Sequence, residues 1–247
     1  MISVCIATHN GEKYIKEQVD SILCQIGVND EVIISDDGST DRTLDILKSY
    51  NDSRIKIFNY IHKQKFRYKF DYSTHNFENA LLQSRGDVIF LSDQDDVWLP
   101  NKVNRVLSNM DNCDILLHGR KVVDANLNVI QEFAMPQDGF WRNIKSCTTT
   151  GCCMVFRREV LKNVLPFPIS GVCHDFWIGV YGSLYYKRKF IKEPLLLYRR
   201  HENNVTPSNL KSNNPILMRI RYRLIMLYEI GKGLFKSLIG KNNFEIK

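Results

Sequence analysis

An early alternation of apolar and polar segments constrains the fold of this chain more than any other feature. Residues 2–7 form an apolar run, and residues 12–25 then place apolar side chains at helical spacing. The pattern repeats with an apolar run at 31–35 and a short helical stretch at 43–49. This order of strand, loop and helix predicts an α/β fold with a parallel sheet, and such sheets bind ligands at the carboxyl ends of their strands.

Polar residues fill the two loops that follow these strands. They are Thr8, His9 and Asn10 after the first strand, and Asp36 and Asp37 after the second. Helix capping by Thr40 or Asp41 is one explanation of the second loop, and for those two residues it competes on equal terms with a ligand site. Capping does not explain the adjacent acidic pair, so the loops favour a ligand site.

Three carboxylates follow a later apolar run at 88–90. Asp93, Asp95 and Asp96 lie within four positions, and like charges held this close disfavour one another's ionisation. A hard divalent cation such as magnesium or manganese would relieve the repulsion, and such ions are usually shared with substrate phosphates. The alternative is a solvated acidic turn before a helix, which is the commoner meaning of a lone Asp-x-Asp.

The rest of the chain continues as a mixture of strands and helices. Strands are expected at 54–58, 87–92, 114–118, 122–129 with a turn near residue 126, and 151–156, paired strands at 190–193 and 195–198, and helices at 76–84, from 100, at 157–163 and at 174–185. The chain shows no internal repeat or low-complexity tract. Residues 1–210 are therefore predicted as one domain and residues 211–247 as an appended tail.

The tail carries most of the positive charge. Residues 211–247 hold eight basic side chains against two acidic ones, a net charge of +6 where the whole chain has +7, which points to an anionic surface as partner. Its apolar residues fall on one helical stripe, namely Ile220, Leu224, Leu227, Leu234 and Leu238. Such a helix can lie in an anionic membrane surface. The alternative is that its apolar side docks on the first domain.

Basic and aromatic residues alternate in a second segment, at 63–70. This pattern can suit the bases and phosphates of a nucleic acid, and it defines an alternative function, that of a basic nucleic-acid-binding protein that is not an enzyme. A solvated edge or loop is the more frequent meaning of such a run. We therefore expect no nucleic acid as a partner.

The cysteines and the apolar runs bear on the compartment. Seven cysteines are present, an odd number without a C-x-x-C pair, and free thiols in a reducing cytosol are the simplest account. Residues 1–7 lack the basic leader and long apolar core of a signal peptide. No run of about 18 apolar residues exists to span a bilayer. We expect a cytoplasmic protein that is soluble or peripheral on the membrane.

Six ordered motifs together resemble the family-two glycosyltransferases over roughly residues 2–208. They are Val4 to Gly11, Ile33 to Arg42, Gly86 to Trp98, Gly151 to Phe156, His174 to Trp177 and Tyr198 to Asn204. The Asp-Gln-Asp-Asp-Val-Trp and His-Asp-x-Trp versions look like bacterial enzymes, often described as rhamnosyltransferases, that build O-antigen and capsule chains. The resemblance implies a GT-A fold, a Rossmann-like mixed and mainly parallel sheet flanked by helices, and sugar transfer from nucleotide diphosphate donors with inversion.

The same resemblance implies roles for residues of the nucleotide and metal sites. By the family pattern, Thr8, His9, Asn10 and Asp37 hold the base and ribose, Asp36 braces them, and Asn76 and Arg85 are weaker candidates for the pocket. Asp95 binds a divalent metal, with His201 approaching the diphosphate or completing the metal shell. Asp93 contacts the ribose or metal-bound water, and Asp96 orients the site. A metal there can neutralise charge on the leaving diphosphate.

The family pattern also places the base and the contacts to sugar. Asp175 occupies the position of the base that activates the acceptor hydroxyl, although Asp is also a favoured helix N-cap. Trp177 is a candidate for stacking on a sugar, with a core position equally open, and His174 departs from the acidic residue often found there. The expected donor is dTDP-rhamnose or a UDP-hexose, and the expected acceptor is a polyprenyl-linked glycan at the cytoplasmic membrane face. Acceptor choice is expected to lie in residues 130–175.

Overall fold

A computed structural model describes residues 1–62, 64–135, 139–145, 149–202, 204 and 216–242. Its strands are β1 Ile2–Thr8, β2 Glu31–Asp36, β3 Ile55–Asn59, β4 Val88–Asp93, β5 Val97–Trp98, β6 Ile115–Val123, β7 Val129–Ala134, β8 Met154–Arg157 and β9 Arg188–Arg199. Its helices are α1 Ile15–Leu23, α2 Thr43–Ser49, α3 Lys69–Gln83, α4 Lys102–Leu107, α5 Phe140–Lys145, α6 Leu161–Val164, α7 His174–Tyr185 and α8 Ile216–Asn242, with short 3-10 turns η1 Gly151–Cys153 and η2 Arg158–Val160.

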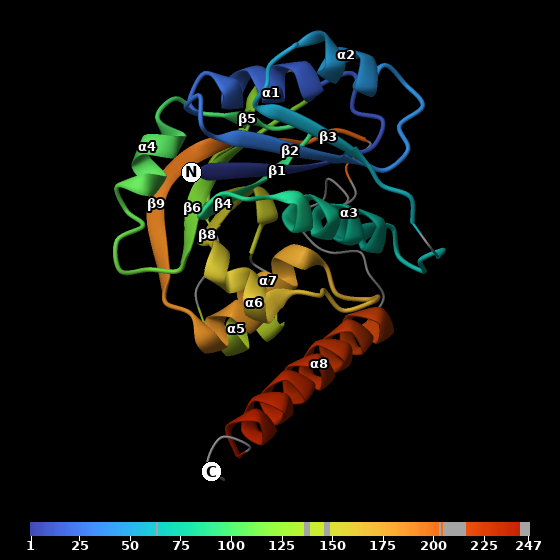
Figure 1. Ribbon diagram of the computed structural model, residues 1–247, viewed down its shortest axis with the longest axis vertical. Coiled ribbons are helices and arrows are strands. Elements are labelled where there is room, and N and C mark those ends of the chain that lie inside the picture. Colours follow the sequence, from blue (N-terminus) through green and yellow to red (C-terminus); the bar gives the residue numbers. More distant parts are fainter. Residues whose placement is uncertain (63, 136–138, 146–148, 203, 205–215, 243–247) are drawn as a thin grey trace.

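The described strands form one mixed sheet in the order β3-β2-β1-β4-β8-β6-β9-β5, with β7 paired to β6. Strands β3, β2, β1 and β4 are parallel, as the opening alternation predicts. Strand β8 is antiparallel to both β4 and β6, whereas β6 and β9 run parallel to each other. Because β1, β2 and β4 end side by side, their polar loops meet at one edge of the sheet (Figure 1).

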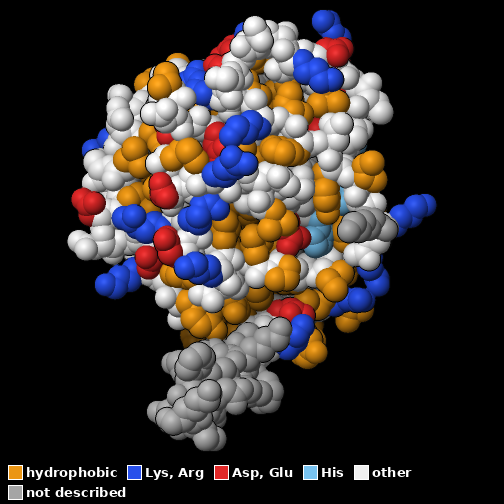
Figure 2. Space-filling view, viewed as in Figure 1, with side chains coloured by type: hydrophobic (Ala, Val, Ile, Leu, Met, Phe, Trp, Pro, Cys, Tyr) orange, Lys and Arg blue, Asp and Glu red, His pale blue; other side chains and the backbone are white. Residues whose placement is uncertain are grey.

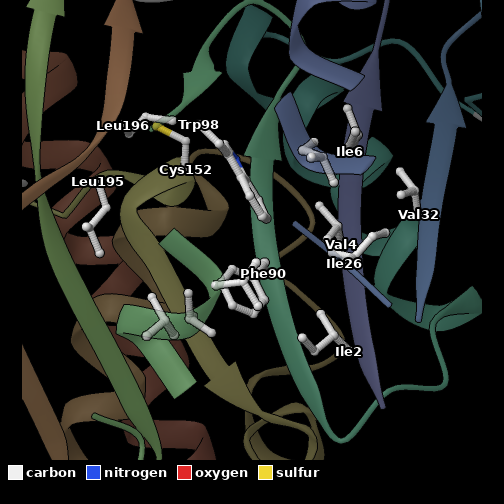
Figure 3. Close-up of a cluster of buried hydrophobic side chains, with 14 of the residues drawn as sticks. Ile2, Val4, Ile6, Ile26, Val32, Phe90, Trp98, Cys152, Leu195 and Leu196 are labelled. Carbon is white, nitrogen blue, oxygen red and sulfur yellow. The ribbon is translucent and has the colours of Figure 1, made fainter. Parts of the chain in front are cut away.

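Two apolar cores cover the two faces of the sheet. The strand period of two sends Val4, Ile6 and Phe90 to one face, where α1, α2 and α4 pack (Figures 1 and 3). It sends Cys5 and Leu91 to the other face, where α3, α5, α6, α7 and part of α8 pack. Burial on both faces explains why these strands read as nearly continuous apolar runs.

Several predicted elements are wrong in extent. The segment predicted at 122–129 contains the predicted turn but is not a strand of its own. Strand β6 runs on through Val123, the side chain of Asp124 accepts hydrogen bonds from the backbone of Asn126 and Asn128, and this turn leads to β7. The paired strands predicted at 190–193 and 195–198 are the single strand β9. Pro194 lacks a backbone N–H, and the register with β6 shifts there rather than the strand ending.

Helix α8 packs on the body of the molecule with part of its surface. Met226 and Ile230 are buried in the second core, and the ring of Tyr222 lies edge-on to Phe176. The residues of the predicted apolar stripe whose side chains are described, Ile220, Leu224 and Leu227, stay exposed. Leu234 and Leu238 belong to that stripe, but their side chains lie outside the described part. The chain division at residue 210 stays a prediction.

Candidate functional site

The loops after β1 and β2 are joined by hydrogen bonds. The hydroxyl of Thr8 donates to the buried carboxylate of Asp36 at 2.8 Å, and Ser39 donates to the same carboxylate through its backbone and its side chain. Asn10, with a left-handed φ of 49°, accepts from the backbone N–H of Thr40 at 2.8 Å. Asp36 therefore has the bracing position expected of it, and Thr8 and Asn10 lie in the same loop cluster.

Gln94 connects the first loop to the acidic loop. The backbone N–H of His9 donates to the Gln94 side chain at 2.9 Å, and the Gln94 amide donates back to the His9 carbonyl at 3.1 Å. A side chain on Gly11 would place its Cβ 2.6 Å from Gln94 Oε1, so this contact needs a glycine. The His9 ring donates through Nδ1 to the Asp37 carbonyl at 2.6 Å, which brings the ends of three strands together.

Sequence reasoning missed two partners in this region. Gln94 stood between two carboxylates and drew no attention, although its middle position was the available signal. The other is His62, whose Nε2 lies 2.8 Å from the Asp37 carboxylate. His62 belongs to a ring cluster in which it contacts Tyr60 and Phe66 edge-on. The sequence gives no sign of the contact between His62 and Asp37, because only the folded loop brings His62 back beside the end of β2.

The carboxylates of the acidic cluster differ in burial. Asp96 is fully buried: one carboxylate oxygen accepts from the Arg199 backbone at 2.9 Å, and the other has no partner among the described residues. Burial, and then the charges of Asp95 and Asp93, raises the pKa of Asp96 well above its usual range. Asp93 is half-buried, and burial, followed by the charges of Asp95 and Asp175, raises its pKa to about 7. The repulsion predicted from sequence is therefore present.

Asp95 and His201 lie together, as the resemblance implies. His201 Nε2 lies 2.8 Å from Asp95 Oδ2, and the Asn204 amide donates to the same oxygen at 3.0 Å. The His201 ring also stacks on Tyr14, with ring centroids 4.8 Å apart. Segments more than 100 residues apart in the chain thus meet at one carboxylate.

Arg199 holds the loop that carries Asp95. Its guanidinium donates to the carbonyls of Asp95 and Ala125, pairs with Glu17, and lies over the Tyr14 ring at 4.6 Å. The side chain is only 3% exposed. In the sequence Arg199 directly follows the strand predicted at 195–198, a position that gave no sign of this role.

The residues present fit a hard divalent ion at Asp95. Carboxylate oxygen and imidazole nitrogen are ligand types that manganese accepts. Asp95 and His201 offer one of each, and the two atoms, Asp95 Oδ2 and His201 Nε2, lie 2.8 Å apart. A second group of possible ligands joins Asp93 and Asp96 to Cys152, with ligand atoms within 4.8 Å of one another. Burial first of all raises the pKa of the Cys152 thiol well above its usual value, so this group lacks a thiolate and suits an ion less well.

A buried lysine lies next to the acidic cluster and was also missed. Lys102, the first residue of α4, is fully buried, donates to the Cys152 carbonyl at 3.1 Å and lies 4.2 Å from the centre of the Trp98 ring. Burial lowers its pKa to about 8. A lysine at the start of a helix ordinarily faces water, and only the fold shows that this one faces the core.

Asp175 is the second residue of α7 and not its cap. The N-cap position belongs to Cys173, and the Asp175 carboxylate accepts a hydrogen bond from the backbone N–H of the next residue, Phe176, at 2.7 Å. The Thr149 hydroxyl donates to the Asp175 carbonyl at 2.9 Å and holds the helix start. The charge of Asp175 contributes to the raised pKa of Asp93, so the two carboxylates lie within electrostatic range of each other.

Of the two positions left open for Trp177, sugar contact or core, the structure shows the core. It is 4% exposed, its indole N–H donates to the Val164 carbonyl at 2.8 Å, and its ring stacks on Tyr181. His174 is also buried, with its ring against Phe77 and against the space that a Gly151 side chain would fill. Burial lowers the pKa of His174, so the ring is uncharged beside Asp175.

Of the two weaker pocket candidates, one lies at the site and the other does not. The Asn76 amide donates to the Thr8 carbonyl at 3.1 Å, and its buried oxygen has no partner among the residues the structure describes. Arg85 is exposed, and its backbone N–H donates to Ser3 and Glu31 at the amino ends of β1 and β2. The prediction that Arg85 lines the pocket is wrong, because the loop before β4 lies at the opposite edge of the sheet.

The basic and aromatic segment uses its rings within the protein. Phe66 stacks on His75 with centroids 4.7 Å apart and meets Tyr72 edge-on, and Tyr68 stacks on Phe70. Lys63 lies outside the described residues. The segment leads directly into α3, which begins at Lys69, seven residues before the predicted start.

Comparison with known proteins identifies the family of the chain. Residues 3–165 match the family described as Glycosyl transferase family 2. The dTDP-rhamnosyl transferase RfbG of Shigella flexneri is 30% identical over 83% of this chain and 74% of its own length. The UDP-Glc:alpha-D-GlcNAc-diphosphoundecaprenol beta-1,3-glucosyltransferase WfgD of Escherichia coli is 27% identical over 73% of this chain and 69% of its own length.

Solved structures share the fold. TarS 1-349 of S. aureus, in complex with UDP-GlcNAc, superposes with a TM-score of 0.68 at 24% identity, covering 91% of this chain and 66% of that one. A mannosyltransferase of Pyrobaculum calidifontis, in complex with GDP-Man and Mn²⁺, gives a TM-score of 0.59 at 17% identity, covering 83% of this chain and 58% of that one. The GT-A fold predicted from sequence is confirmed, and the chain belongs to glycosyl transferase family 2.

Proposed function

We propose that this glycosyltransferase is a metal-dependent inverting enzyme that transfers one sugar from a nucleotide diphosphate sugar to a lipid-linked glycan in bacterial surface polysaccharide synthesis. The observation that carries the proposal is the contact between Asp95 and His201 next to Asp93, whose pKa is raised in part by the charge of Asp175. In this proposal Asp175 is the base for the acceptor, and Asp95 and His201 are ligands of a metal at the leaving group. RfbG and WfgD, by their names, use dTDP-rhamnose and UDP-glucose, so the donor is one of these classes.

The nucleotide would lie across the loops after β1 and β2. Asp37 and His9 present a carboxylate and a backbone held by Gln94, and Asn76 offers a buried amide oxygen without a partner in the described chain. Buried polar atoms left unpaired in a folded protein cost free energy, so a ligand that pairs with one gains affinity. The loops therefore form a rigid edge on which a base and ribose can be oriented.

The transfer step follows from the positions of the carboxylates. The acceptor hydroxyl gives its proton to Asp175 as its oxygen forms a bond to the anomeric carbon, and the bond from that carbon to the diphosphate breaks. A divalent ion at Asp95 and His201 would supply positive charge to the leaving diphosphate. Asp93 would contact the ribose or a metal-bound water, the role that the family pattern implies for it.

The acceptor and location are part of the proposal. The name of WfgD states a diphosphoundecaprenol acceptor, and we infer a polyprenyl-linked acceptor for this chain, met at the cytoplasmic face of the membrane. The helices in the described part of the chain include none that could cross a bilayer. Contact with the membrane would therefore be peripheral.

A donor screen tests the proposal. The full chain is incubated with Mn²⁺ and a panel that includes dTDP-rhamnose, UDP-glucose and UDP-galactose, and donor hydrolysis is followed by release of nucleotide. With a supplied acceptor, Asp175→Asn is expected to lower kcat by about 10²- to 10⁴-fold, the usual contribution of a general base. Asp45→Asn is the matched control, because Asp45 is also in the first turn of a helix but is exposed. Absence of turnover with every donor, or an Asp175→Asn variant as active as Asp45→Asn, refutes the proposal.

A further inference from the structure

Helix α8 has two apolar sides, and only one of them packs on the protein. On the packed side, Met226 and Ile230 are buried, and the Arg223 guanidinium donates to the Ile144 carbonyl of α5 at 2.8 Å. Ile225 packs against the second core and closely approaches Gly171. These contacts fix the rotation of the helix about its own axis.

The other side of α8 is apolar and exposed. Leu217 is 80% exposed, Leu224 61%, Ile220 48% and Leu227 42%. At 3.6 residues per turn, Leu224 points roughly 160° away from Met226. The four side chains, here called the outer stripe, therefore face away from the body of the molecule. A described apolar stripe of this length left in water is unusual, because monomeric proteins rarely expose contiguous apolar patches of this kind.

Two further exposed apolar side chains lie on the segments that hold α8. Trp141 is 75% exposed on α5, the helix that Arg223 contacts, and Ile169 is 72% exposed two residues before Gly171. Figure 2 shows hydrophobic side chains mixed with basic ones where the described part of α8 meets the body. Tryptophan is enriched at membrane interfaces, where its ring is apolar and its N–H meets water.

The charge around the outer stripe is positive. Arg221 is exposed and lies beside the stripe, three residues before Leu224, whereas the exposed Arg219, seven residues before Met226, lies toward the packed side. The one acidic side chain of the described helix, Glu229, is paired with Lys232 at 2.8 Å. An apolar stripe bordered by an exposed arginine, on a helix with a positive net charge, is complementary to the headgroups and acyl chains of an anionic bilayer, where basic residues gain from the negative surface potential.

We propose that the outer stripe of α8, extended by Trp141 and Ile169, docks on an anionic lipid bilayer with the helix lying in the plane of the interface. The opposite side of α8 carries Tyr222, which touches Phe176, the residue after Asp175. A helix with its side chains is about 10–12 Å across. The start of α7 therefore lies about one helix diameter from the headgroups.

This placement bears on the acceptor and in that respect rests on the proposed function. A sugar attached to a membrane lipid through a diphosphate extends only a short way from the headgroups. A base about one helix diameter above them is at the height at which such an acceptor hydroxyl can be reached, whereas a nucleotide sugar enters from water at the loops after β1 and β2.

Vesicle sedimentation tests the docking surface. The full chain is mixed with sucrose-loaded vesicles of phosphatidylglycerol and phosphatidylethanolamine, or of phosphatidylcholine alone. We expect binding to the anionic vesicles and an at least tenfold lower affinity for an Ile220→Glu/Leu224→Glu variant. Leu82→Glu is the matched control, because Leu82 is 65% exposed on α3 and is not part of the stripe. The control variant is expected to bind like the unaltered chain.

The competing outcomes are separable. Failure of the unaltered chain to bind anionic vesicles, or equal binding by the stripe and control variants, overturns the proposal. So does a dimer, seen by light scattering, that the stripe variant dissolves without any loss of lipid binding. Circular dichroism and thermal unfolding of each variant show whether it is folded. An Arg219→Gln/Arg221→Gln variant with unchanged lipid binding removes the charge argument and overturns the choice of an anionic surface.

Donor hydrolysis without vesicles separates this proposal from the proposed function. The stripe variant is expected to hydrolyse donor at the unaltered rate, since the stripe lies outside the nucleotide site. Lipid binding without any donor turnover would refute the transferase and leave the docking surface in place.

Discussion

Trp177 offers a direct test of the structure. The sequence allows it to contact a sugar or to lie in the core, and the fold buries it in the core. Replacement by Phe removes the indole N–H that donates to the Val164 carbonyl and part of a ring that stacks on Tyr181 at 4.4 Å. Leaving a buried carbonyl unpaired costs about 1–3 kcal/mol. The smaller ring adds about 1–2 kcal/mol for lost contact and cavity.

The expected loss is therefore about 2–5 kcal/mol of unfolding free energy, if both contributions add. In urea, with a slope of about 3 kcal/mol/M for a chain of this size, the midpoint falls by roughly 1 M. Trp141→Phe is the control, because Trp141 is 75% exposed and the same substitution there is expected to change stability by less than about 0.5 kcal/mol. The KM for donor is expected to be unchanged in both variants. An unaltered urea midpoint together with a tenfold higher KM in Trp177→Phe would refute the assignment to the core.

Three further predictions concern the loops, the metal and pH. Gly11→Ala is expected to displace Gln94 and so to break two hydrogen bonds of about 1 kcal/mol each. Binding of UDP or dTDP, measured by calorimetry, should weaken by about 30-fold, and a Gly11→Ala variant that binds better than Gln94→Ala contradicts this expectation. His201→Ala is expected to raise the Mn²⁺ concentration needed for half-maximal donor turnover by about 10- to 100-fold. Nucleotide binding without metal should be unchanged, because the variant leaves His9 and Asp37 intact. An unshifted Mn²⁺ titration contradicts this expectation. Burial alone would lower the pKa of His75, but its hydrogen bonds to Glu78 and the Ile169 carbonyl raise the pKa above the usual value. The stabilisation from His75 is therefore fully present below pH about 6.5 and is lost as pH rises through the higher folded pKa. His75→Gln should make thermal stability less dependent on pH over that window, and an unchanged pH dependence contradicts this expectation.

Local patterns predicted the first half of the fold well, because its strands are buried on both faces and its loops end at glycine or acidic residues. The parallel pairing of β1, β2 and β4 follows from that order. The second half was less accessible. Strand β9 is continuous across Pro194 only because β6 tolerates a shift in register there, and no feature within 188–199 encodes the partner strand.

The site shows the same division. Asp95 and His201 were paired through motif order, although more than 100 residues separate them, and they meet at 2.8 Å. Trp177 was left open between sugar and core, because a helix with aromatic residues on several sides does not reveal which side is covered. Arg85 was misplaced because its position along the chain does not show at which edge of the sheet the loop lies. Arg199 was invisible because its partners are backbone carbonyls from two other segments.

The two hydrogen bonds between Gln94 and His9 have a thermodynamic consequence. They join the loop that would hold the base to the loop that would hold the metal, so neither can be ordered without the other. Ordering shared in this way is a coupling free energy, and such couplings are reciprocal. The factor by which Mn²⁺ tightens nucleotide binding must then equal the factor by which nucleotide tightens Mn²⁺ binding, and both factors should shrink together when Gln94 is shortened.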